Sequence, residues 1–255
     1  MDLKNKTILV TRPKPQGEIL CEKLRALNGN AISFPTIDIK PLQDYTLLKE
    51  QLAQLDQYDW LIFVSPQAVQ HCHALLHAAW PILPNELKIA AVGLGTANAL
   101  QAVNLPVTAC PAQWSSEGLL NMPLLQQVQG HRIVIVAGEG GRELLADTLT
   151  ERGAEIIRMI VYRRCLPVYQ NINDYLALFH TRKIDIIVVT SSEGLHNLIS
   201  LLGDIELIRT LPLVVMSERL VGIAEELRFK QIILAENASD IAIIEALNKG
   251  INYGR

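Results

Sequence analysis

Two stretches of the chain share the same order of apolar and polar positions. Residues 7–29 read TILVTRPKPQGEILCEKLRALNG, and residues 132–153 read RIVIVAGEGGRELLADTLTERG. Each begins with a short apolar run, passes through a Gly/Pro-containing loop, and then places apolar residues at helical spacing before a closing glycine. When Ile8 is aligned with Ile133, Leu20 meets Leu145. The pattern predicts a strand and then a helix in both places, and it indicates an internal duplication.

The similarity continues further along the chain. Residues 59–65 (DWLIFVS) parallel residues 185–191 (DIIVVTS), and Ser115 precedes a Leu-Leu pair as Ser239 precedes an Ile-Ile pair. Short Val/Ile-rich strands that alternate with helices are typical of parallel sheets covered on both faces. We therefore expect an α/β protein with two doubly wound parallel-sheet lobes that arose by internal duplication.

Two segments look like extended connectors. Residues 34–42 (FPTIDIKPL) and 159–167 (MIVYRRCLP) alternate large apolar with polar positions, and a proline near each end discourages helix. A pair of antiparallel connectors would let each lobe take its opening strand and helix from one copy and the rest from the other. A plain tandem that divides near residues 126–130 is the alternative, and the periodicity fits both.

Composition and charge exclude several classes of protein. The chain has 255 residues, of which 49% are hydrophobic and 19% charged, with a net charge of −3. These values argue against disorder and against a nucleic-acid binder driven by phosphate attraction. No apolar run approaches the roughly 18 residues of a membrane helix, and no signal-peptide pattern is seen at residues 1–13. Because the four cysteines lie far apart and form no CxxC pair, we expect idle thiols in a reducing cytoplasm. From the charge and the apolar runs, we expect no nucleic-acid or membrane partner.

The loop AGEGGR at residues 137–142 is a candidate anion site. Glycines such as Gly138 let backbone N–H groups approach an anion at a helix N-terminus, and Arg142 adds a guanidinium fork. The alternative is a tight strand-to-helix turn with a solvated arginine. The glycines do not have the GxGxxG spacing of a dinucleotide site, which argues against a nicotinamide enzyme.

Small hydroxyl residues recur where the predicted strands end. In open α/β sheets, ligands bind beyond the carboxyl ends of the strands, so these hydroxyls would line a cleft. Helix N-capping is the alternative function, and it is compatible with ligand contact. These hydroxyl residues are Thr11, Ser65, Thr96, Thr190, Ser191 and Ser192.

Histidines gather at His71, His73 and His77, but no acidic residue lies near them in sequence and HExxH is absent. We expect a surface helix rich in histidine and no metal site. GxSxG is also absent, so a hydrolase triad has no support.

Tyr162 lies in the second connector beside Arg163 and Arg164. A phenol among cations is a candidate proton donor. The alternative is an aromatic strand residue with its hydroxyl in water.

Short pieces that are each weakly specific recur along nearly the whole chain. They are VTRP at 10–13, FP at 34–35, FVSP at 63–66, AVG at 91–93 with TA at 96–97, GEGGRE at 138–143, VYRR at 161–164, VTSS at 189–192 and SER at 217–219. In their order and spacing, these pieces together resemble the uroporphyrinogen-III synthase family.

This resemblance implies the crossed arrangement of the lobes. One discontinuous lobe would comprise residues 1–36 and 168–255, and the other residues 37–167, joined by the two connectors. The implied enzyme is a cofactor-independent lyase of haem biosynthesis that cyclises hydroxymethylbilane to uroporphyrinogen III. Water is lost and ring D is inverted through a spiro intermediate, and the enzyme acts by orienting its eight-carboxylate substrate.

The resemblance also assigns roles to residues. Tyr162 matches the family's acid, which helps the substrate hydroxyl to depart. The implied substrate contacts are Thr11, Arg12, Ser65, Thr96, Gly138, Arg142, Ser191 and Ser192. We expect a monomer that receives its substrate by transient hand-over from hydroxymethylbilane synthase. A non-catalytic two-lobe sensor or binder of an anionic small molecule is the alternative.

Overall fold

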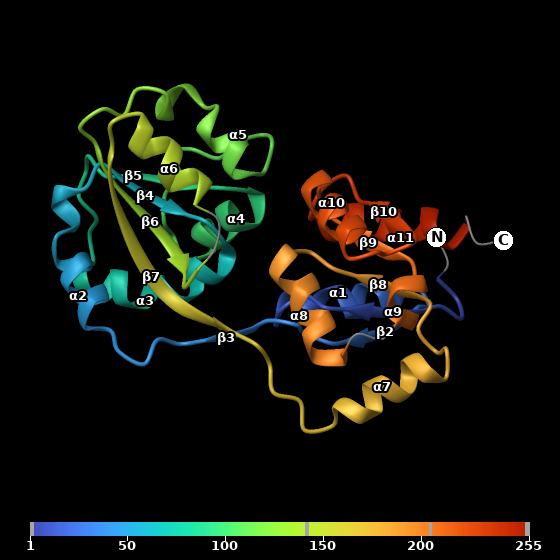
Figure 1. The fold of residues 1–255 in the computed structure, drawn as a ribbon. Coiled ribbons are helices and arrows are strands. Elements are labelled where there is room, and N and C mark those ends of the chain that lie inside the picture. The colour runs from blue at the N-terminus through green and yellow to red at the C-terminus, as the bar shows by residue number, and fades with distance from the viewer. Residues whose placement is uncertain (1–2, 141–142, 204–205, 253–255) are drawn as a thin grey trace. The chain divides into compact units, whose positions relative to one another are not determined.

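The short apolar runs form the strands, and the segments with helical spacing form the helices between them (Figure 1). This computed structural model describes residues 3–140, 143–203 and 206–252. The chain divides into two compact units. Unit 1 comprises residues 1–39 and 165–255, and unit 2 comprises residues 40–164.

Unit 1 contains a five-stranded sheet with the order β10-β9-β8-β1-β2, and its neighbouring strands pair in parallel. Helices alternate with these strands along the chain. The elements are β1 (Thr7–Val10), α1 (Gln16–Ala26), β2 (Asn30–Ser33), α7 (Ile172–His180), β8 (Ile186–Val188), α8 (Ser192–Leu202), α9 (Glu206–Thr210), β9 (Leu213–Val215), α10 (Glu218–Glu226), β10 (Ile232–Leu234) and α11 (Asp240–Asn252).

The second sheet has the order β3-β7-β6-β4-β5, in which β5, β4, β6 and β7 pair in parallel. Its strands belong to unit 2 except at the two ends of that unit, where the division of the chain falls within β3 and before the last residue of β7. A parallel bridge from Ala90 to Ala109 extends the sheet beyond β5. The elements are β3 (Asp38–Lys40), α2 (Thr46–Ala53), η1 (Leu55–Gln57), β4 (Trp60–Phe63), α3 (Pro66–Ala79), β5 (Lys88–Ala91), α4 (Leu94–Ala102), α5 (Ser116–Leu120), η2 (Pro123–Leu125), β6 (Arg132–Gly138), α6 (Leu144–Glu151) and β7 (Glu155–Cys165).

Each sheet combines strands from both copies of the repeat. The opening strand of the first copy, β1, lies beside β8 of the second copy, and the opening strand of the second copy, β6, lies beside β4 of the first. The strand order is therefore crossed, and a plain tandem does not describe it.

Equivalent aspartates make the same junction in both sheets. Asp185 Oδ2 accepts a hydrogen bond from the Thr7 N–H at 2.7 Å, where β8 meets β1. Asp59 Oδ2 accepts from the Arg132 N–H at 2.8 Å, where β4 meets β6. These two aspartates occupy the same place in the repeat, so the crossed junction itself is duplicated.

Alternating side chains along each strand place apolar groups on both faces of its sheet. In unit 1, Ile8 and Val10 belong to one buried cluster together with residues of α1 and α11. Leu9, between them, belongs to a second cluster with residues of α7, α8 and α10. Burial on both faces explains why the strands read as continuous apolar runs. Within the described ranges, no helix has the length and apolar character needed to cross a bilayer.

Candidate functional site

The strand order places a topological switch point in each sheet. In both units the opening strand has the next strand of its own copy on one side and a strand of the other copy on the other side. Connections leave such a pair on opposite faces, and ligands bind in the crevice beyond the carboxyl ends of the strands. The switch point lies between β6 and β4 in unit 2, and between β1 and β8 in unit 1. Several predicted site residues immediately follow these four strands.

Gly138 lies at the switch point of unit 2, opposite Tyr162. The register of β6 and β7 shifts between Ala137 and Gly138, so that Gly138 pairs with Tyr162. A Cβ atom added at Gly138 would overlap three carbons of the Tyr162 ring. Irregularities of this kind re-aim a side chain at the end of a strand. The absence of a side chain at Gly138 therefore makes room for the tyrosine ring.

Tyr162 and Ser65 are brought together from distant parts of the sequence. Tyr162 Oη lies 3.3 Å from Ser65 Oγ, within hydrogen-bond range. Ser65 is also the N-cap of α3, where its Oγ accepts from the Ala68 N–H at 3.1 Å. Tyr162 is only 5% exposed. The alternative expectation, a hydroxyl in open water, therefore does not describe this tyrosine.

The ring of Tyr162 also contacts His71 of α3. The two ring centroids are 5.4 Å apart, with an interplanar angle of 38°. Burial lowers the pKa of His71, which favours the neutral imidazole at neutral pH. The helix rich in histidine was expected at the surface; His77 is exposed there, whereas His71 is partly buried against Tyr162. Within the described part of the chain, no group of three or more His, Cys, Asp or Glu side chains could hold a metal ion.

A cavity of about 210 Å³ lies beside these residues within unit 2. Gly138 and Tyr162 line it, together with two cationic side chains, Arg158 and Arg164. Arg158 forms an ion pair with Glu143. A molecule bound in this cavity would meet the phenol of Tyr162, the guanidinium groups of Arg158 and Arg164, and the backbone at the end of β6. Its remaining lining is mainly apolar and comes from Val64, Ser116, Ile135, Ala137, Gly140, Leu145, Ala146 and Ile160.

Arg142, the cation predicted from the AGEGGR loop, lies outside the described residues. Arg158 and Arg164 were not predicted as cavity residues. Alternation along an extended strand would place residues 158, 160, 162 and 164 on one face, and this signal was available in the sequence.

In unit 1, the polar groups of Thr11 and Arg12 have internal partners. Thr11 is 2% exposed, and its hydroxyl donates to the Val188 carbonyl at 2.9 Å across the switch point. The Arg12 guanidinium donates to Asp240 at 2.7 Å and to the Ala238 carbonyl at 2.6 Å. Both residues hold the strand end in place. A direct substrate contact by either would require these partners to be exchanged.

Asp240 is held between two cations. Burial alone would raise the pKa of its carboxyl group, but hydrogen bonds from Lys23 and Arg12 outweigh burial and lower the pKa. The Lys23 ammonium lies 2.7 Å from Asp240 Oδ2. Asp240 is therefore a charged anchor for the loop that follows β1.

The other predicted hydroxyl residues lie at or just inside helix N-termini: Ser191 makes the bond that the capping alternative expected, whereas Ser192 and Thr96 stand in the first turns of α8 and α4, and Gly93 is the N-cap of α4. Ser191 Oγ caps α8 by accepting from the Gly194 N–H at 3.0 Å. Ser192 Oγ accepts from the Arg219 guanidinium at 3.0 Å. Thr96 is 4% exposed in the first turn of α4. Substrate contact by Ser191, Ser192 and Thr96 stays a prediction.

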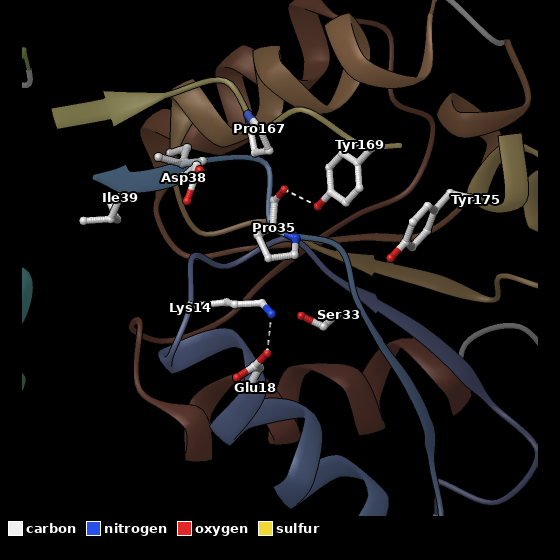
Figure 2. Close-up of a pocket in the computed structure, with 10 residues that line it drawn as sticks. Lys14, Glu18, Ser33, Pro35, Asp38, Ile39, Pro167, Tyr169 and Tyr175 are labelled. Atoms are coloured by element: carbon white, nitrogen blue, oxygen red, sulfur yellow. Dashed lines mark hydrogen bonds and ion pairs between the residues drawn. The ribbon is translucent and has the colours of Figure 1, made fainter. Parts of the chain in front are cut away.

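A second cavity, of about 280 Å³, lies in unit 1 where β2 continues toward β3 (Figure 2). The Tyr169 hydroxyl donates to the Pro35 carbonyl at 2.6 Å, and Lys14 forms an ion pair with Glu18 at 2.7 Å. Burial raises the pKa of Tyr169 well above its usual value. None of the predicted site residues lines this cavity, but both predicted connectors contribute to it, through Pro35, Ile37, Asp38, Ile39 and Pro167.

Comparison with known proteins identifies the family. A family model described as uroporphyrinogen-III synthase HemD matches residues 19–245. The uroporphyrinogen-III synthase of Escherichia coli K12 is 40% identical over 248 residues, which cover 94% of this chain and 99% of that protein. The synthase of Salmonella typhimurium LT2 is 39% identical over 249 residues, with the same coverage of both chains.

Solved structures show the same fold. A mutant uroporphyrinogen III synthase of the extremely thermophilic bacterium Thermus thermophilus matches with a TM-score of 0.67 at 17% identity, covering 97% of this chain and 99% of that one. The Helicobacter pylori enzyme matches with a TM-score of 0.59 at 14% identity, covering 96% and 99%. The family model and the enterobacterial relatives do not favour a non-catalytic binder. With the family model spanning most of its length, the chain belongs to the uroporphyrinogen-III synthase family.

Proposed function

We propose that this chain converts hydroxymethylbilane to uroporphyrinogen III, with Tyr162 as the acid that releases the substrate's hydroxyl group. The observation that carries the proposal is the Tyr162 hydroxyl, buried at a switch point, 3.3 Å from Ser65 Oγ and beside a cavity with two arginines. A positioned phenol in such a place can act as a general acid.

The proton transfer balances within the reaction. Tyr162 gives its proton to the terminal hydroxyl of the bilane as the carbon–oxygen bond breaks, and the bonding electrons leave with oxygen as water. The remaining azafulvene on ring A is attacked by the substituted carbon of ring D, which gives the spiro intermediate. Fragmentation and reclosure then invert ring D. The proton lost from ring D in the final closure returns to the tyrosinate, so neither oxidant nor reductant is needed.

The electrostatics of the cavity fit a substrate with many carboxylates. Arg164 and Arg158 line the cavity beside Tyr162, and a guanidinium group can hold a carboxylate through two hydrogen bonds. For Arg158 this would exchange its present partner, Glu143, for a substrate carboxylate. The arginines therefore serve substrate binding. The predicted contacts Thr11, Arg12, Thr96, Arg142, Ser191 and Ser192 remain part of the proposal.

The product isomer tests this function. Without enzyme, hydroxymethylbilane closes without inverting ring D and gives the type I isomer. The purified chain, supplied with enzymatically generated hydroxymethylbilane, is expected to give mainly the type III isomer after oxidation and chromatography. Mainly type I product would reject the enzyme and support the non-catalytic binder.

The role of Tyr162 is tested with a matched pair of variants. Tyr162→Phe keeps the buried ring and removes only the hydroxyl, so kcat should fall by roughly 10²- to 10⁴-fold, the range for a lost general acid. Tyr58→Phe removes a hydroxyl from another buried tyrosine of unit 2, beside the opposite end of β4, and should keep wild-type kcat. Equal kcat values for the two variants would remove Tyr162 from the mechanism.

Three finer expectations belong to the same proposal. We expect a monomer, a cytoplasmic location and direct hand-over of substrate from hydroxymethylbilane synthase. Light scattering after size exclusion tests the first, and cell fractionation tests the second. Channelling past an added trap for free hydroxymethylbilane tests the third, because a handed-over substrate escapes the trap.

A further inference from the structure

The Ser65 hydroxyl has two hydrogen-bond partners, the Ala68 N–H and the Tyr162 hydroxyl, and these determine which way the Ser65 proton can point. A serine hydroxyl has one proton to donate and lone pairs that can accept two hydrogen bonds. The Ala68 N–H already donates to Ser65 Oγ at 3.1 Å. The proton of Ser65 remains available, and Tyr162 Oη lies 3.3 Å away.

We propose that Ser65 is a positioning residue that donates a hydrogen bond to Tyr162 and thereby directs the phenol proton into the cavity. This inference rests on the proposed role of Tyr162 as the acid. If Tyr162 donated to Ser65 instead, its proton would point away from a substrate. With Ser65 as the donor, the tyrosine oxygen is held on one side while its own proton faces the other.

The same contact stabilises Tyr162 after it has given up its proton. A hydrogen bond to an ionised oxygen is shorter and stronger than one between neutral groups. Ser65 also sits at the N-terminus of α3, a helix of 14 residues, where the aligned peptide dipoles place partial positive charge. Its hydrogen bond therefore strengthens as negative charge develops on the tyrosine.

His71, which belongs to the same helix, α3, also contacts the ring of Tyr162. Its imidazole packs against Tyr162 with the ring centroids 5.4 Å apart. The N-cap of α3 thus holds the hydroxyl while a later turn of the helix holds the ring. Movement of the phenol is restricted at both ends, as orientation-based catalysis requires.

The test is a double-mutant cycle measured on hydroxymethylbilane turnover. Ser65→Ala should lower kcat by about tenfold, the value of one hydrogen bond, with little change in KM. In a Tyr162→Phe background, Ser65→Ala should change kcat by less than roughly twofold, because the residue through which it acts has lost its hydroxyl. Ser65→Thr, which keeps a hydroxyl suited to an N-cap, should restore most of the kcat.

Ser239→Ala is the control for the effect of losing a helix cap. Ser239 Oγ accepts from the Ala242 N–H at 3.2 Å at the start of α11, a helix of 13 residues. Both cap variants should lower the midpoint of thermal unfolding by similar amounts, and only Ser65→Ala should lower kcat.

The outcomes separate this inference from the proposed function. Wild-type turnover by Tyr162→Phe would reject Tyr162 as the acid and the role of Ser65 with it. If Tyr162→Phe has a lowered kcat, and the fall in kcat of the double variant equals the product of the falls in the two single variants, only the positioning role of Ser65 would be rejected. An increase in KM with unchanged kcat in Ser65→Ala would make Ser65 a substrate contact and overturn the inference.

Discussion

Gly138→Ala adds one methyl group at the point where two strands bring a glycine against the tyrosine ring. The new Cβ would lie 2.8 Å from Cδ2 of Tyr162 and closer still to Cε2 and Cζ. Non-bonded carbon atoms prefer separations of about 3.5–4.0 Å, so the ring has to retreat by more than 1 Å. A shift of that size would lengthen the 3.3 Å contact between Tyr162 and Ser65 beyond hydrogen-bond range.

The cost of that shift can be estimated. A misplacement of about 1 Å at a catalytic group lowers turnover by roughly 100-fold, which corresponds to about 2.7 kcal/mol in the activation barrier. Overpacking of the strand should also lower the free energy of unfolding by about 1–3 kcal/mol. The alanine variant should therefore fold, show reduced stability in urea, and cyclise hydroxymethylbilane about 100 times more slowly at saturating substrate.

Gly222→Ala is the matched control. A Cβ atom at Gly222, inside α10, meets nothing within 4 Å, so alanine should raise the free energy of unfolding by about 0.5–1 kcal/mol and leave turnover unchanged. Wild-type kcat in Gly138→Ala, together with a crystal structure in which the Tyr162 ring has not moved, would refute the reasoning.

Two further predictions concern stability. Asp185→Ala removes the acceptor of the Thr7 N–H and should lower the free energy of unfolding by about 1–3 kcal/mol in urea titrations; an unchanged midpoint would contradict the role of the duplicated junction. Asp240→Asn should destabilise the protein at pH 7, because the cations beside Asp240 favour its charged form. Since the pKa of Asp240 is lowered from 3.8 in the folded state, this contribution is present above that pH and is lost as the pH falls below it. Unfolding curves of both proteins between pH 7 and pH 2.5 should therefore converge at the acid end, and a constant difference would count against the ion pairs.

The repeat could be predicted from the sequence because it rests on local apolar patterns. Ile8 and Ile133 begin the same kind of segment, and both lie in opening strands beside a switch point. Local patterns carry no information on which strand an opening strand will join. The partner of β1 is β8, more than 170 residues away along the chain, so the crossed order needed the resemblance or the structure.

In the site, too, the sequence indicates which residues matter but not which residues they contact. Ser65 and Tyr162 could be singled out from their positions at a strand end and in a connector. Their contact could not, because they lie 97 residues apart and meet beside an irregular register of β6 and β7 that no local pattern announces. Thr11 and Arg12 could be assigned as polar residues after a strand, but their internal partners, Val188 and Asp240, depend on the crossed sheet.

The crossed sheets set an order of events during protein synthesis. Translation of unit 2 is complete at residue 164. The strand β1 is made early, but β8, which pairs with it, is made only when residues 186–188 are translated. At the usual 5–20 residues per second, roughly 10–35 s separate the two strands at the ribosome. During that interval the apolar run Thr7–Val10 has no sheet to enter beyond its local partner, β2. The middle of the chain can thus become native first, and the earliest residues to be made are among the last to be enclosed.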